Sequence, residues 1–158
     1  TVKDSGGVTF IPALSGLGAP YWNPKATGSI LGITRGTEKG HIARAALEGI
    51  AIRTYEIIQN MQKDANTQFT NLKVDGGASN NNLLMQIQCN LIEANVIRPV
   101  ITETTALGVG FLAGLGSGYW KSIEDLKNIW KHDRKFIPEI SNKENILSKW
   151  KETINVLY

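Results

Sequence analysis

The sequence has few of the residues from which disulfide frameworks, metal sites and membrane spans are built. It contains one cysteine, Cys89, which excludes an internal disulfide, and its two histidines lack the spacing of metal ligands. No stretch approaches the ~20 apolar residues that a membrane-spanning helix needs. We therefore expect a cytoplasmic protein with no membrane span and no metal ligands of its own.

The sequence also has no large excess of positive or negative charge. The net charge is +3, and the basic residues are spread along the chain. The one loose basic cluster, Lys127–Lys135, is interrupted by Asp133, so we interpret it as a solvated helix end and loop. No nucleic-acid partner is expected.

What is present fits one globular domain. A chain of 158 residues with 42% hydrophobic and 20% charged residues can bury a sizeable core, and we predict a single domain over residues 1–158. The sequence has no initiator methionine and reaches a strand-like pattern by Val8. We expect it to be part of a longer protein.

The apolar periodicity predicts an α/β order of elements. In residues 39–64, apolar and small side chains at intervals of three and four predict one long helix with one stripe, which Ala46, Ala51 and Ile58 widen; the stripe is Ala43, Leu47, Ile50, Thr54, Ile57 and Met61. Residues 106–116 are small and apolar and predict a helix packed tightly against a sheet. The remaining predicted strands span 9–13, 28–33, 71–74, 95–98 and 133–137, and the remaining helices span 81–93, 122–130 and 141–158.

The segment Val74–Asn82 predicts a strand end, a tight turn and a helix start within a few residues. Gly76 and Gly77 permit backbone angles that other residues avoid and leave no side chain in the way of a ligand. Ser79 or Asn80 could cap the following helix, whose first N–H groups carry partial positive charge. The pattern is neither a dinucleotide-binding G-x-G-x-x-G nor a phosphate-binding P-loop. On this motif alone, an ordinary turn remains as good an interpretation as a nucleotide site.

Longer motifs in a fixed order add specificity. The segments Pro12–Pro24 and Gly28–Gly36 resemble a signature of glycerol kinases. The segments Val74–Pro99, Glu103–Gly108 and Leu112–Leu115 resemble the C-terminal signature of the wider FGGY carbohydrate kinase family. Together these resemblances cover about residues 8–150.

The resemblance implies an actin-like ATPase fold of the ribonuclease H-like class, with a mixed sheet flanked by helices. In this family two domains close around a cleft that holds ATP and a polyol, and the chain resembles the C-terminal one only. The resemblance assigns nucleotide binding to the backbone of Gly77 and the side chain of Asn81, with Gly76, Ala78 and Ser79 as wall residues. It implies ATP as cosubstrate, with Mg²⁺ held mainly through the phosphates and the domain that this chain lacks.

No catalytic residue is expected in this chain. The family's catalytic aspartate and polyol-binding residues belong to sequence before Thr1, and we interpret Glu103 and Asp75 as structural. The full-length protein is expected to phosphorylate glycerol to glycerol 3-phosphate and to form a homo-oligomer, whereas the chain alone is expected to be inactive. The segment Gly18–Trp22 is what favours glycerol. A kinase for another polyol or sugar, and a non-catalytic actin-like module that binds a nucleotide or a protein partner, remain alternatives.

Overall fold

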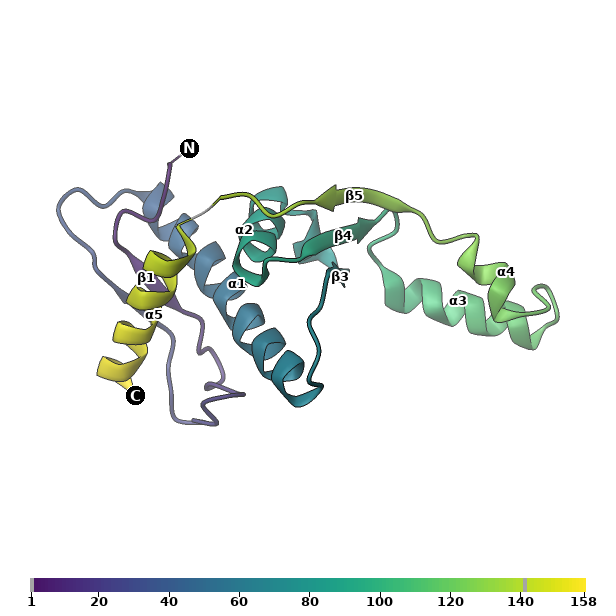
Figure 1. Cartoon of the computed structure of the whole chain (residues 1–158), viewed down its shortest axis with the longest axis horizontal. Coiled ribbons are helices and arrows are strands. Elements are labelled where there is room, and N and C mark those ends of the chain that lie inside the picture. The colour runs from purple at the N-terminus through teal and green to yellow at the C-terminus, as the bar shows by residue number, and fades with distance from the viewer. Residues whose placement is uncertain (1, 141) are drawn as a thin grey trace.

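The structure, a computed structural model, describes residues 2–140 and 142–158 and mixes helices with short strands (Figure 1). The predicted helix start at Ser141 lies outside the described residues. The strands are β1 (Thr9–Ile11), β2 (Ser29–Leu31), β3 (Asn71–Lys73), β4 (Asn95–Pro99) and β5 (His132–Phe136). The helices are α1 (Lys39–Asp64), the 3₁₀ turn η1 (Gly77–Asn80), α2 (Asn82–Ile92), α3 (Thr104–Gly116), α4 (Ile123–Lys127) and α5 (Lys143–Leu157).

The strands form two small sheets. β3 and β4 pair in parallel, with Leu72 opposite Val96, and β5 pairs antiparallel to β4, with Lys135 opposite Ile97. Because α2 connects β3 to β4, this part of the chain is a β-α-β unit of the kind that the sequence predicts. β1 and β2 form a separate antiparallel pair. Among the described residues, β3 pairs on one side only.

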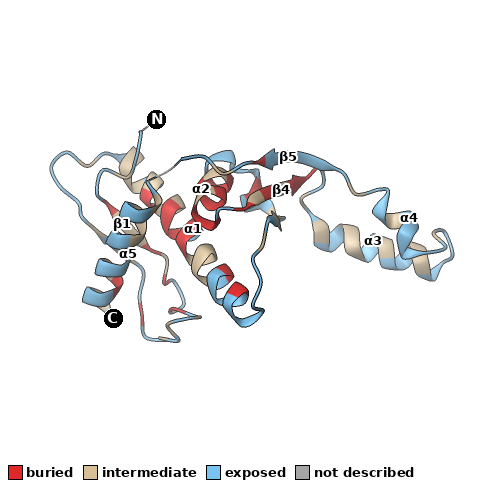
Figure 2. Cartoon of the chain, in the orientation of Figure 1, coloured by how far each residue is buried: buried red, intermediate tan, exposed pale blue. Residues whose placement is uncertain are grey.

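The core lies between α1, α2, α5, β1 and β4 (Figure 2). The predicted inner stripe of α2 is confirmed, because Leu84, Ile87 and Leu91 are all buried. Cys89 is buried beside them, as its place in the apolar rhythm predicts. Trp150 of α5 is the largest side chain that is almost fully buried.

Helix α1 begins and ends where the periodicity predicts, but the centre of the predicted stripe is wrong. Ile50 and Ile57 are 43% exposed and Met61 is 53% exposed. Ala51 and Ile58, from the predicted flank of the stripe, are buried together with Ala45, Gly49 and Ile52, because β1 and α2 pack on that side. A Cβ atom at Gly49 would collide with the backbone of Phe10, so glycine is what permits this close approach.

Two polar side chains accompany this buried face. Glu48 is buried, and its Oε1 accepts a hydrogen bond from Nε of Arg44 at 2.7 Å. Gln62 is buried as well, and its Oε1 accepts from the backbone N–H of Phe69 at 2.6 Å. Because each is paired, each can lie on the buried face of the helix.

Helix α3 forms over the predicted residues but is not packed against a sheet, so that prediction is wrong. None of its residues is buried, and α3 and α4 project away from the rest of the molecule (Figure 2). Added Cβ atoms at Gly108, Gly110 and Gly116 would meet nothing within 4 Å. The physical reason is that no described segment lies against these faces of the helix.

Helix α4 is shorter than predicted. Its capping box is the one that the sequence indicates, with Ser122 and Asp125 exchanging hydrogen bonds. The helix ends at Lys127 rather than at Trp130. Among the described residues, no helix is long and apolar enough to cross a membrane.

Candidate functional site

The Gly-Gly turn lies directly after β3 and opens toward solvent. Gly76 adopts φ +75°, a left-handed conformation that favours glycine. Added Cβ atoms at Gly76 and Gly77 would meet nothing within 4 Å, and Gly77 and Ala78 are exposed. The turn therefore offers bare backbone on a surface that a flat ligand can approach.

Asn81, rather than Ser79 or Asn80, caps helix α2. Its Oδ1 accepts from the backbone N–H of Leu84 at 3.1 Å, whereas Ser79 is buried and donates to the carbonyl of Gly76 at 2.7 Å. No hydrogen bond within the described residues uses Nδ2 of Asn81. One side chain can thus cap the helix and still donate to a ligand. The structure places Gly76, Gly77, Ala78 and Asn81 together, as their closeness in sequence requires.

Arg98 on β4 holds this turn in place through hydrogen bonds. Sequence reasoning missed this residue. Its guanidinium donates to the carbonyl of Ser79 at 2.8 Å and to Oδ1 of Asn82 at 2.9 Å. It also pairs with Asp133 at 2.7 Å. A lone charged residue after the apolar pair Val96 and Ile97 of the strand was the available signal, because such a buried cation needs several partners.

The turn is also tied to the segment that leads into α3. The N–H of Gly76 donates to the carbonyl of Thr102 at 2.8 Å, and the hydroxyl of Thr104 donates to the carboxylate of Asp75. These contacts agree with our interpretation of Asp75 as a structural residue. Glu103 is exposed at the N-terminal end of α3.

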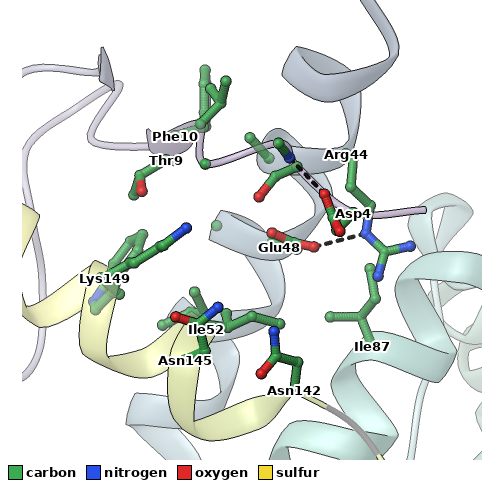
Figure 3. A pocket seen from close by; sticks show the side chains of 18 of the residues that line it. Asp4, Thr9, Phe10, Arg44, Glu48, Ile52, Ile87, Asn142, Asn145 and Lys149 are labelled. Carbon is green, nitrogen blue, oxygen red and sulfur yellow. Dashed lines mark hydrogen bonds and ion pairs between the residues drawn. The ribbon is translucent and has the colours of Figure 1, made fainter. Parts of the chain in front are cut away.

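A cavity of about 610 Å³ lies elsewhere (Figure 3). It is lined by the N-terminal segment, α1 and α5, and no residue of the Gly-Gly turn contributes to it. Arg44 and Glu48 pair with each other on its wall, and Lys149 extends into it from α5. Within the described residues, no group of three or more His, Cys, Asp or Glu side chains could hold a metal ion.

The segment Pro12–Pro24 is anchored through Tyr21 by a partly buried polar cluster. Tyr21 donates to Oε1 of Glu56, and Nε1 of Trp150 donates to the same oxygen at 2.8 Å. Arg53 pairs with the other carboxylate oxygen at 2.5 Å. Burial, and then the hydrogen bond to Glu56, raises the pKa of Tyr21 to about 12.

The next residue in this segment, Trp22, behaves differently from Tyr21. It is 76% exposed and adopts φ +50°, an uncommon conformation for a bulky residue. The two adjacent aromatic residues therefore differ in role. Tyr21 anchors the Pro12–Pro24 segment to α1 and α5, and Trp22 is exposed to solvent.

The comparison with known families decides what kind of chain this is. Residues 1–117 match the C-terminal domain of the FGGY family of carbohydrate kinases. The chain belongs to the FGGY family. A glycerol kinase of Saccharolobus islandicus is 54% identical over 156 residues, which is 98% of this chain and 31% of that protein. A glycerol kinase of Deinococcus radiodurans is 50% identical over 98% of this chain, again 31% of its own length.

Solved structures support the same assignment. A crystal structure of Plasmodium falciparum glycerol kinase with ADP matches 99% of this FGGY chain and 32% of its own, with a TM-score of 0.86 and 33% identity. Gluconate kinase from Lactobacillus acidophilus matches 97% of the chain and 32% of its own, with a TM-score of 0.78 and 25% identity. The predicted actin-like α/β fold, with a mixed sheet flanked by helices, is confirmed. The chain spans about a third of the length of the relatives that it matches.

Proposed function

We propose that this chain is the adenosine-binding part of a glycerol kinase, and that the full-length protein transfers the γ-phosphate of ATP to glycerol to give glycerol 3-phosphate and ADP. The observation that carries the proposal is 54% identity to a glycerol kinase over 98% of the chain, with the Gly-Gly turn intact and open within the matched region.

The residues of the turn fit the nucleoside part of ATP. The open backbone at Gly76, Gly77 and Ala78 admits a planar ring, and Nδ2 of Asn81 can donate to it while Oδ1 caps α2. Arg98 holds the turn in place through Ser79. Mg²⁺ would be bound through the phosphates, since the described residues hold no cluster of ligands for it.

This chain contributes binding and orientation rather than proton transfer. Phosphoryl transfer depends mainly on positioning and charge stabilisation, and a fixed adenosine aligns the phosphates for attack. The base that accepts the proton of the glycerol hydroxyl would come from the part of the kinase that this chain lacks. A kinase for another sugar is the second candidate, since gluconate and xylulose kinases share the fold at 25% identity.

Calorimetric titration with ADP tests the proposal. Saturable ADP binding is expected, and Gly77→Val should abolish it because the added side chain occupies the surface on which the ligand lies. Asn81→Ser keeps a capping oxygen but removes the amide donor, so it should weaken ADP binding by about 1–2 kcal/mol without unfolding α2. Asn80→Ala, in the same turn but unassigned, is the matched control.

The proposal fails if Gly77→Val binds ADP as tightly as the unmodified chain. It also fails if the folded chain, alone and joined to the missing part of a glycerol kinase, shows no saturable ADP binding.

A further inference from the structure

Strand β4 carries a buried arginine directly opposite a second arginine. Arg98 is the pairing partner of Arg134 on β5, so both side chains project from the same face of the sheet. Both guanidinium groups also lie near the ring of Phe136, with the Cζ atoms of Arg98 and Arg134 at 5.6 Å and 4.8 Å from its centroid. Like charges placed opposite each other repel, and Arg98 is only 9% exposed. A negative charge beside Arg98 is therefore needed.

A β-bulge supplies that charge. Arg98 pairs with Arg134, but the next residue, Pro99, pairs with His132, so Asp133 is an extra residue on β5. In a regular strand Asp133 would point away from the face that carries Arg134, because successive side chains alternate. The bulge breaks this alternation, and Oδ2 of Asp133 lies 2.9 Å from Nε and 2.7 Å from Nη2 of Arg98. Pro99 has no N–H to donate, and a bulge is where a central strand tolerates it.

The remaining nitrogen of Arg98 contacts the chain on both sides of Asn81. Nη1 donates to the carbonyl of Ser79 at 2.8 Å and to Oδ1 of Asn82 at 2.9 Å. Asn81 lies between these two contacts, and its own Oδ1 caps α2. The hydroxyl of Ser79 donates in turn to the carbonyl of Gly76. Contacts on both sides of Asn81 restrict its backbone, and with it the direction of its Nδ2 amide.

We propose that Arg98 and Asp133 are positioning residues of the nucleotide site, which hold residues 79–82 in the binding conformation before the nucleotide arrives. The inference rests on the proposed function, because that function assigns the nucleotide to this turn. Both side chains act through the turn rather than by touching the nucleotide. Order that exists before binding does not have to be created during binding, so the pair raises the affinity for the nucleotide.

The planar guanidinium suits this arrangement, and an ammonium group does not. Nε and Nη2 of Arg98 face Asp133, whereas Nη1 faces the turn. A lysine at this position would keep the charge, but its single nitrogen on a flexible stem cannot hold both partners in these directions. Arg98→Lys therefore removes the geometry and preserves the charge.

Calorimetric titration of the 158-residue chain with ADP tests the proposal. Arg98→Lys should weaken ADP binding about tenfold, because the turn loses charge-assisted hydrogen bonds that order it. Asp133→Asn keeps the size of the side chain but removes its charge, and should weaken binding by about threefold. Arg134→Lys is the matched control, since Arg134 lies opposite Arg98 beside the same ring. No hydrogen bond of the described residues joins Arg134 to the turn, so this variant should bind ADP as the unmodified chain does.

Amide exchange without nucleotide separates a local effect on the turn from a general loss of stability. The N–H groups of Asn81 and Leu84 are bonded within the turn and its cap. In Arg98→Lys their exchange should quicken about tenfold, whereas that of Leu91, in the same helix, should stay unchanged. A merely structural role of Arg98 would quicken exchange throughout α2. Far-UV circular dichroism verifies that each variant is folded.

The inference is wrong if Arg98→Lys binds ADP as tightly as the unmodified chain, if Arg134→Lys weakens binding equally, or if exchange quickens equally throughout α2. If Arg98→Lys does not fold, the same criteria apply to Asp133→Asn, whose side chain is 48% exposed. If the unmodified chain binds no ADP, alone or joined to the missing part of a glycerol kinase, the proposed function fails. The exchange comparison then decides the inference, since faster exchange confined to the turn supports it and uniform or unchanged exchange overturns it.

Discussion

Helices α1 and α3 both contain glycine and small apolar residues but have opposite surroundings. Helix α1 belongs to the body of the molecule, the described residues outside 104–127, and α3 belongs to the arm, which is residues 104–127 with α3, α4 and their connection. Gly49 in α1 lies against the backbone of Phe10, whereas Gly108 in α3 faces open space. Both helices are rich in small and apolar residues, yet only α1 has a packed face. An apolar pattern therefore indicates that other residues will pack on a helix. It does not indicate whether those residues belong to this 158-residue chain.

The polar contacts of the body and of the arm differ in a similar manner. The body buries the carboxylate of Glu48 and the side chain of Gln62 and pairs both. Apart from the Thr104–Asp75 hydrogen bond, the arm keeps its polar contacts local and exposed, in the Ser122–Asp125 capping box and the Lys127–Glu124 ion pair at 2.6 Å. Exposed pairs of this kind contribute about 0–1 kcal/mol, so long-range contacts hold the body and mainly local ones hold the arm.

The largest expected effect on stability comes from Trp150, the largest almost fully buried side chain of the body. Trp150→Ala should lower the free energy of unfolding by roughly 3–5 kcal/mol, because it removes a buried indole and leaves Glu56 with one hydrogen bond fewer. Urea denaturation measures this. Leu112→Ala, on the arm, should change the free energy by less than about 0.5 kcal/mol. Equal losses in the two variants would mean that the arm is as well packed as the body.

The next comparison substitutes glycine by alanine in both regions. Gly49→Ala should destabilise by about 1–3 kcal/mol, because its Cβ forces the Phe10 backbone away from α1. Gly108→Ala should stabilise the isolated chain by about 0.5–1 kcal/mol, since alanine favours helix and meets no neighbour. The thermal midpoints of the two variants should therefore shift in opposite directions. A shift of the same sign in both would remove the distinction between body and arm.

The sequence was informative where structure is local. The bounds of α1, the inner stripe of α2 and the Ser122 cap follow from periodicity and capping rules that involve only neighbours along the chain. The Gly-Gly turn was found for the same reason, since its conformation depends on a few consecutive residues. Assignment of that turn to adenosine came from the family resemblance and stays a prediction.

Features that depend on tertiary partners were missed. The polar part of the buried face of α1 could not be predicted, because Glu48 and Gln62 become acceptable in the core only through their pairing. Arg98 was missed because its role requires β4, η1 and β5 to be placed together. The exposure of α3 could not be foreseen, since its apolar pattern is that of a buried helix.

The smallest effect concerns the hydroxyl of Tyr21, which joins the Pro12–Pro24 segment to the body. Tyr21→Phe should lower the free energy of unfolding by about 1 kcal/mol at pH 8, because the hydrogen bond to Glu56 is lost. Tyr119→Phe, on the exposed surface of the arm, is the matched control and should have no effect at this pH.

The pH dependence makes this test specific. The pKa of Tyr21 is raised from 10.0 to about 12 in the folded protein, because burial and then the Glu56 hydrogen bond favour the neutral phenol. A raised pKa means that the unfolded chain loses this proton first, so the stabilisation is complete below pH 10 and declines as the pH rises toward 12. The difference in stability between the unmodified chain and Tyr21→Phe, measured by urea denaturation, should therefore shrink over that window. A difference that stays constant or grows would show that the phenol does not keep its proton through its contacts with the body.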